Sequence, residues 1–133
     1  MSVPSVMAFA DSEPALTVID EEHLGRMTLG DVSLEREVLE IFVRQIGIML
    51  KRIDSAEPRV AAAAAHTLKG SARGIGAWRL AQAAEQLEEA VAGRLHGEAV
   101  SAATEALEAA CQEVSAAIRA RLGDGTNSRR ALG

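Results

Sequence analysis

Apolar residues recur every three or four positions along most of this chain, which is the period of an amphipathic helix. The clearest repeat starts after Ser33 and ends before Pro58, and it predicts one long helix. Its apolar positions are Leu34, Val38, Ile41, Phe42, Ile46, Met49 and Ile53. Pro58 suits the first turn of a second helix over 58–73, and Gly74 and Gly76 supply its stop.

Three further segments also have helical patterns. A short helix is expected to follow Asp20, which is a good N-cap, and to end at Gly30. The segment 77–92 predicts a helix whose inner side consists of Leu80, Ala84, Leu87 and Val91. After a turn at 93–97, the last helix is expected over 98–122. Its apolar stripe consists of Val100, Ala103, Leu107, Ala110, Val114, Ala117 and Ile118.

The fold class that these segments predict is all-α. Aromatic residues make up only 2% of the chain, and no window shows the β-branched and aromatic enrichment that strands favour. Four long amphipathic helices with short loops bury their stripes most simply as an antiparallel up-and-down four-helix bundle, with the short N-terminal helix capping one end. We expect a flexible N-terminal arm over 1–17, one domain over 18–122 and a disordered C-terminal tail over 123–133.

Charge and composition exclude several classes of partner. The net charge of −5 argues against a nucleic-acid surface, which needs a basic stripe. No segment approaches the roughly 18 uninterrupted apolar residues of a membrane span, and the N-terminus lacks the basic leader of a signal peptide. The single cysteine, Cys111, cannot form an internal disulfide. We therefore expect a cytoplasmic protein without nucleic-acid or membrane partners, and a monomer, because a closed bundle needs no second chain.

The predicted helix over 58–73 separates two kinds of residue onto opposite faces. At about 100° per residue, a stripe within about 60° of His66 carries Lys69, Gly70 and Arg73. The opposite side is apolar and consists of Ala61, Ala64, Ala65, Leu68, Ala72 and Ile75. The imidazole of His66 is therefore expected to face water.

This stripe is suited to phosphoryl chemistry. A neutral, water-facing imidazole is a competent nucleophile, and Lys69 and Arg73 can pair with phosphoryl oxygens. Glycine inside a helix costs about 1 kcal/mol relative to alanine, so Gly70 indicates either close helix packing or space for a partner beside His66. The chain has no glycine-rich phosphate loop and no dinucleotide fingerprint. We therefore expect a phosphoryl carrier without its own ATP site, not an enzyme, with the catalysis supplied by a partner.

One segment resembles the signature of histidine phosphotransfer (HPt) domains, the four-helix carriers of two-component phosphorelays. It reads His66-x-Leu68-Lys69-Gly70-Ser71-Ala72-x-x-x-Gly76, with further similarity at Gly30-Asp31 and Glu37-Val38-Leu39-x-x-Phe42. The resemblance covers 18–122. It implies that His66 takes a phosphoryl group from an aspartyl phosphate on a receiver domain and passes it to another receiver aspartate.

The resemblance also implies residue roles and partners. Lys69 would stabilise the phosphoryl group, with Arg73 as a second cation, and Gly70 would leave room for the receiver. The docking face would include Thr67, Gly70 and Arg73. The implied partners are response-regulator receiver domains and a hybrid histidine kinase. No cofactor is expected on this chain, and Mg²⁺ would belong to the partner receiver.

Alternative interpretations stay open. The chain could be a phosphotransfer domain related to a chemotaxis-type or sensor histidine kinase, although sensor kinases carry an acidic residue where this chain has Thr67. It could also be a structural adaptor bundle that no longer carries phosphate. A metal site built from His23, His66 and His96 lacks the Glu-x-x-His spacing of carboxylate-bridged iron sites, so no metal is expected.

Two features of the segment 77–92 have plainer expected roles. Glu85, Glu88 and Glu89 are expected to form a solvated face, because no cleft that would make them a catalytic pair is visible. Trp78, the only tryptophan, is expected to pack at the end of the bundle.

Overall fold

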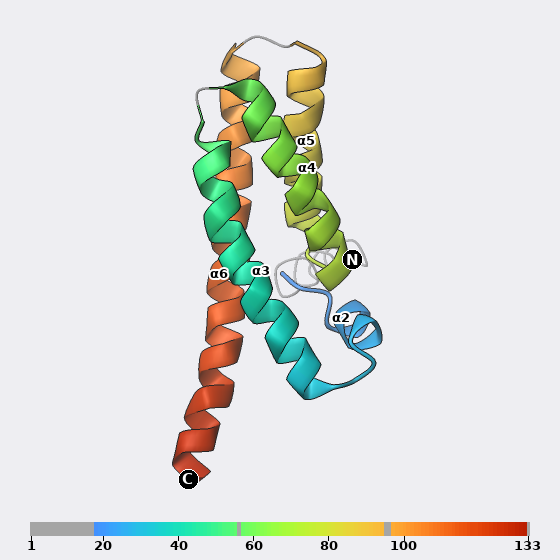
Figure 1. Ribbon diagram of the computed structural model, residues 1–133, viewed down its shortest axis with the longest axis vertical. Helices are drawn as coiled ribbons and strands as arrows, with labels where there is room; N and C mark the ends of the chain where they lie inside the picture. The colour runs from blue at the N-terminus through green and yellow to red at the C-terminus, as the bar shows by residue number, and fades with distance from the viewer. Residues whose placement is uncertain (1–17, 56, 95–96, 133) are drawn as a thin grey trace, which may run out of the picture.

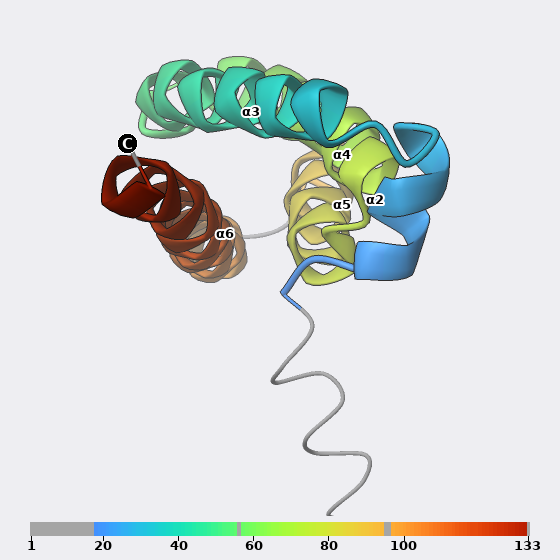
Figure 2. The ribbon, with the colours of Figure 1, turned by 90° about the horizontal axis from the view of Figure 1, so that it is seen from below.

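The computed structural model describes residues 18–55, 57–94 and 97–132, with 124–132 as backbone only. Within these ranges the chain forms five helices, which are α2 (Glu21–Met27), α3 (Val32–Ile53), α4 (Pro58–Ile75), α5 (Trp78–Ala92) and α6 (Gly97–Leu132). The four long helices alternate in direction, and α2 lies across one end of α4 (Figure 1). Contacts join α3 to α4, α4 to α5, α5 to α6 and α6 back to α3, so the bundle is closed (Figure 2). The predicted antiparallel four-helix bundle is confirmed.

The core follows the predicted apolar stripes most closely on α4. All six residues that the helical wheel placed on its inner side are buried, and no other residue of α4 is. On α3 the prediction was partly wrong, because Leu39 is buried, whereas Leu34 and Ile41 are 38% and 53% exposed. The apolar band on α3 is wider than the face that the bundle covers, and periodicity alone does not locate the edge of that face.

Side-chain caps set the starts of the first two helices. The Oδ1 atom of Asp20 accepts a hydrogen bond from the backbone N–H of His23 at 3.1 Å, as predicted for an N-cap. Asp31 caps α3 in the same way through Leu34. The turn between α2 and α3 is tight, with positive φ angles of 56° at Leu29 and 73° at Gly30.

The crossing between α2 and the end of α4 depends on Gly76. The helix runs through Gly74 to Ile75, two residues beyond the predicted end, and Gly76 caps it in the left-handed conformation with φ of 83°. The backbone N–H of Asp20 donates to the carbonyl of Gly76 at 2.9 Å. A Cβ at Gly76 would lie 2.9 Å from the Cβ of Asp20. Only glycine therefore allows both the turn and this close approach.

Trp78 completes the same end of the bundle, as predicted. Its indole N–H donates to Oδ2 of Asp20 at 3.0 Å, and its ring lies 4.9 Å from the ring of His23. The indole is 46% exposed. The hydrogen bonds from Trp78 and from the backbone of His23 hold the pKa of Asp20 below its usual value.

The last helix differs from the sequence-based expectation. It continues to Leu132 and projects past the other helices, whereas a disordered tail was expected from residue 123 (Figure 1). Each glycine in this stretch costs only about 1 kcal/mol in a helix, and no proline interrupts it. Arg121 forms ion pairs with Glu21 and Glu35, which tie α6 to α2 and α3 just before the projection. The expected N-terminal arm, 1–17, lies outside the described residues.

In the described part of the chain, no helix combines the length and the apolar character needed to cross a bilayer. Cys111 is fully buried on α6, and burial raises the pKa of its thiol to about 12. The thiol is therefore protonated and unreactive at neutral pH.

Gly76→Ala should lower the free energy of unfolding by about 2 kcal/mol, because alanine is strained at positive φ and its Cβ meets the backbone of Asp20. Gly47→Ala is the matched control. Gly47 lies inside α3, and a Cβ added there would have nothing within 4 Å, so alanine should add up to about 1 kcal/mol. Urea unfolding of both variants measures the difference, and equal effects would contradict the role assigned to Gly76.

Candidate functional site

His66 lies on the exposed face of α4, as predicted. Its side chain is 70% exposed, while the opposite face of the helix is packed into the core. The fold therefore holds the backbone of His66 rigidly and leaves its ring accessible. Of the predicted neighbours, Thr67 and Gly70 are also exposed on this face.

A carboxylate from the next helix contacts this histidine. Oε2 of Glu88, on α5, lies 2.8 Å from Nδ1 of His66, and Oε1 of the same carboxylate lies 2.7 Å from Nζ of Lys69. The side chains of Lys69 and Glu88 are only 17% and 23% exposed. The expectation that Glu88 belongs to a solvated face was wrong. Sequence periodicity placed it at the edge of α5 but could not show that this edge faces Lys69.

The side chains of His66, Lys69 and Glu88 form a cluster, called the Glu88 cluster below. Its contacts determine the charge state of the Glu88 carboxyl group. Burial raises the pKa of its carboxyl group, but the hydrogen bonds from Lys69 and His66 outweigh burial and leave the pKa below its usual value. Glu88 is therefore a carboxylate at neutral pH and can only accept hydrogen bonds. The contact at 2.8 Å accordingly requires a proton of His66 on Nδ1, and in the neutral imidazole this leaves the Nε2 lone pair free.

The other predicted cation is held more loosely. Arg73 lies one turn beyond Lys69, and its guanidinium is 3.8 Å from a carboxylate oxygen of Glu85 on α5. Both side chains are about half exposed, at 52% and 43%. Such exposed pairs contribute little to stability, so Arg73 can reorient toward another anion at small cost.

Gly70 has open space around it. A Cβ built there would meet nothing within 4 Å, so packing among the described residues does not require the missing side chain. This result removes close helix packing as the explanation for Gly70.

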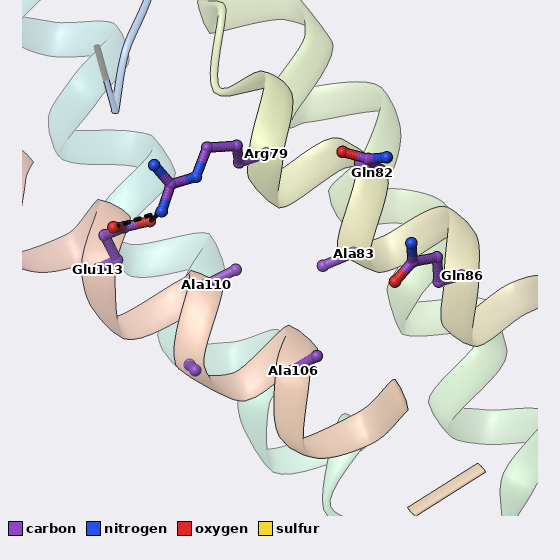
Figure 3. Close-up of a pocket in the computed structure, with 8 residues that line it drawn as sticks. Arg79, Gln82, Ala83, Gln86, Ala106, Ala110 and Glu113 are labelled. Carbon is purple, nitrogen blue, oxygen red and sulfur yellow. Dashed lines mark hydrogen bonds and ion pairs between the residues drawn. The ribbon is translucent and has the colours of Figure 1, made fainter. Parts of the chain in front are cut away.

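The structure separates His23 from this site. His23 lies on α2 against Trp78, and His96 is outside the described residues. Among the described residues no group of three or more histidine, cysteine, aspartate or glutamate side chains is placed to hold a metal ion. A hollow between α5 and α6 is bordered by the ion pair of Arg79 with Glu113 and by small and amide side chains (Figure 3). His66 does not line it.

The sequence of this chain matches the family model described as Hpt domain over residues 37–117. The chain belongs to the Hpt domain family. Its role is therefore histidine phosphotransfer in two-component signalling, and the matched range includes α4 and α5 with His66, Lys69 and Glu88.

Solved structures agree with this assignment. The histidine phosphotransferase ShpA from Caulobacter crescentus is 30% identical, with 87% of this chain and 99% of that chain covered and a TM-score of 0.58. A candidate histidine-containing phosphotransfer protein from rice is 16% identical, with 90% of each chain covered and a TM-score of 0.66, which shows the shared fold. No curated protein matches the chain.

The lowered pKa of Glu88 predicts an acid-sensitive contribution to the stability of this Hpt domain. A carboxyl group whose pKa is depressed by folding stabilises the folded state above its unfolded pKa, and the stabilisation is lost as pH falls through the folded pKa. Glu88→Gln should therefore lower the free energy of unfolding by about 1 kcal/mol at about pH 7 and by much less at about pH 3.

Urea unfolding at the two pH values measures this difference. Glu89→Gln is the control, because Glu89 is exposed on the same helix and has no ion pair among the described residues. A loss of stability in Glu88→Gln that is as large at low pH as at neutral pH would contradict the explanation.

Proposed function

We propose that this Hpt protein relays a phosphoryl group between receiver-domain aspartates through Nε2 of His66. The observation that carries the proposal is the contact of Nδ1 with Glu88 on an otherwise exposed ring. The contact assigns one nitrogen to the proton and leaves the other as the nucleophile. It also limits rotation of the ring, so that Nε2 keeps a defined direction for attack.

Transfer of the phosphoryl group to His66 needs no external base. The Nε2 lone pair attacks the phosphorus of an aspartyl phosphate, the N–P bond forms, and the P–O bond breaks with its electron pair left on the aspartate carboxylate. The imidazole proton stays on Nδ1 throughout, where it is hydrogen-bonded to Glu88. The phosphorylated ring gains positive charge in this step, and the adjacent carboxylate stabilises it. Transfer to a second receiver is the reverse reaction.

Lys69 has two roles in this proposal. Its ion pair with Glu88 at 2.7 Å neutralises a carboxylate that would otherwise repel the incoming phosphate. It also lies one helical turn from His66, within reach of a phosphoryl oxygen on that residue. Arg73, held only loosely by Glu85, supplies a second cation farther along the same stripe.

The protein acts as a carrier, with catalysis supplied by its partner. The sequence contains no nucleotide-binding motif, and the receiver would supply the Mg²⁺ that assists transfer. A hybrid histidine kinase is a suitable source of the phosphorylated receiver. The four helices bury their apolar stripes within one chain, which supports a monomer, and the buried free thiol of Cys111 fits a reducing cytoplasm.

His66→Gln should abolish labelling by a phosphorylated receiver domain, because no other residue is proposed to accept the group. The measurement is transfer of ³²P from a panel of purified receivers, with the label on the wild type expected to be acid-labile and alkali-stable, as for a phosphoramidate bond. His23→Gln is the matched control and should retain labelling. Label that persisted in the His66 variant would overturn the assignment.

Gly70→Ala should raise the stability of the protein and lower the rate of phosphoryl transfer. Because a Cβ at this position meets nothing within 4 Å, the substitution should raise the free energy of unfolding by up to about 1 kcal/mol. The new methyl group would stand beside His66 on the exposed face, so transfer from a receiver should slow by roughly tenfold. Gly47→Ala, equally uncrowded on α3, should gain stability without slower transfer. Equal transfer rates in the two variants would show that the receiver does not need the space at Gly70.

A further inference from the structure

Two ion pairs connect α4 to α5 beside His66, and they differ in strength. Lys69 meets Glu88 at 2.7 Å, and both side chains are less than a quarter exposed. One turn away on each helix, Arg73 lies 3.8 Å from Glu85, with 52% and 43% of the two side chains exposed. A separation of 3.8 Å is too long for a hydrogen bond, so the second pair is held by charge alone. The first pair is therefore a fixed contact, whereas the second can exchange partners.

The guanidinium of Arg73 lies close to the position where a phosphoryl group would be attached. Its partner Glu85 precedes Glu88 by three residues, and side chains three apart on a helix are neighbours, with Cβ atoms about 5–6 Å apart. Glu88 in turn contacts the ring of His66 at 2.8 Å. The guanidinium is therefore about one helical turn from the imidazole, a distance that rotation of a long arginine side chain can cover.

The surface of α4 between Arg73 and His66 is bare. Gly70, which lies between them on the exposed face, has no side chain, and a Cβ there would have nothing within 4 Å. Helical side chains lean toward the N-terminus of their helix, so Arg73 leans toward His66. Lys69 shows this lean, because its ammonium and the ring of His66 meet the same carboxylate. Arg73 can therefore move toward a phosphoryl group on His66 along an open path.

A phosphoryl group is a stronger partner for Arg73 than Glu85 is. It carries up to about two negative charges on three acceptor oxygens, whereas the carboxylate carries one charge. A guanidinium can bind two of these oxygens at once through charge-assisted hydrogen bonds, which the pair at 3.8 Å lacks. Glu85 loses little when Arg73 leaves, because its side chain is 43% exposed and water can solvate the carboxylate.

We infer that Glu85 is a positioning residue for the relay, which holds Arg73 beside His66 before phosphorylation and releases it to the phosphoryl oxygens afterwards. The exchange stabilises the phosphorylated state by the difference between the two ion pairs, so Glu85 sets how strongly the protein retains the phosphoryl group. This inference rests on the proposed function, because Arg73 has a second anion to bind only if His66 is phosphorylated. It adds Glu85, a half-exposed acid on α5, to the residues that act in the relay.

The equilibrium constant for transfer from one receiver to the protein tests this exchange. The constant depends only on the free energies of the separate proteins and not on how they dock, so its change between variants reports the stability of the phosphohistidine. Arg73→Gln should lower it by about tenfold, because a charge-assisted contact is lost. Arg59→Gln is the matched control and should change it by less than about twofold. Arg59 is exposed and precedes His66 by seven residues, as Arg73 follows it by seven, but it leans away from the imidazole.

Glu85 is tested with and without its arginine. Glu85→Gln should raise the constant by about threefold, because a competing carboxylate no longer holds Arg73. In the Arg73→Gln background, the same substitution should have no more effect than Glu89→Gln, which removes an exposed charge that has no ion pair among the described residues. An effect of Glu85→Gln that persists without Arg73, or equal constants for Arg73→Gln and Arg59→Gln, would overturn the inference.

Phosphorylation by phosphoramidate, a small donor, distinguishes failure of this exchange from failure of the proposed function. The wild type is labelled with no receiver present, and the ¹⁵N signal of the Arg73 guanidinium, assigned by its absence from Arg73→Gln, should shift on labelling. Absence of label from His66 would count against the proposed function itself. Label on His66 with an unchanged Arg73 signal would overturn the exchange alone.

Discussion

The site depends on how closely α5 can lie against α4. Four of the six buried residues on α4 are alanines, and α5 contributes Ala81 and Ala84 to its own buried face. Small side chains allow two helix axes to approach toward the lower end of the usual range of about 8–10 Å. Across this interface the carboxylate of Glu88 reaches both His66 and Lys69, at 2.8 and 2.7 Å. Larger core residues on α4 would move the carboxylate out of hydrogen-bonding range of the imidazole.

Gly70 and Gly76, the two glycines of the family signature, are present in this chain for different physical reasons. Gly76 is required inside the molecule, because the left-handed turn and the crossing of Asp20 leave no room for a Cβ. Gly70 is surrounded by open space, so packing among the described residues does not explain why this position is a glycine. A signature that looks uniform in sequence therefore combines one constraint from folding with one that we attribute to a partner.

Sequence periodicity predicted those features of the structure that depend on the sequence of a single helix. The buried face of α4 was predicted in full, because its apolar residues repeat with the period of that helix alone. Glu88 was missed because its partner lies on another helix, and the rotation of α5 relative to α4 depends on packing that no single repeat contains. The exposure of Ile41 was missed for a related reason. An apolar residue at the edge of a wide stripe can serve the core or an external surface, and only the arrangement of neighbouring helices decides which.

The Glu88 cluster also bears on the reversibility of the carrier. A phosphohistidine that is too stable would not pass its group on, and one that is too unstable would not form, so the relative free energies of the two phosphorylated states must be close. Glu88 alone would stabilise the positive ring that results from phosphorylation but repel the phosphoryl group attached to it. Lys69 alone would do the reverse. Held together at 2.7 Å, the two side chains present little net charge to the approaching donor while still fixing the ring through Nδ1. In the proposed relay, the cluster therefore orients Nε2 of His66 without strongly favouring either direction of transfer, which leaves the direction to the receivers.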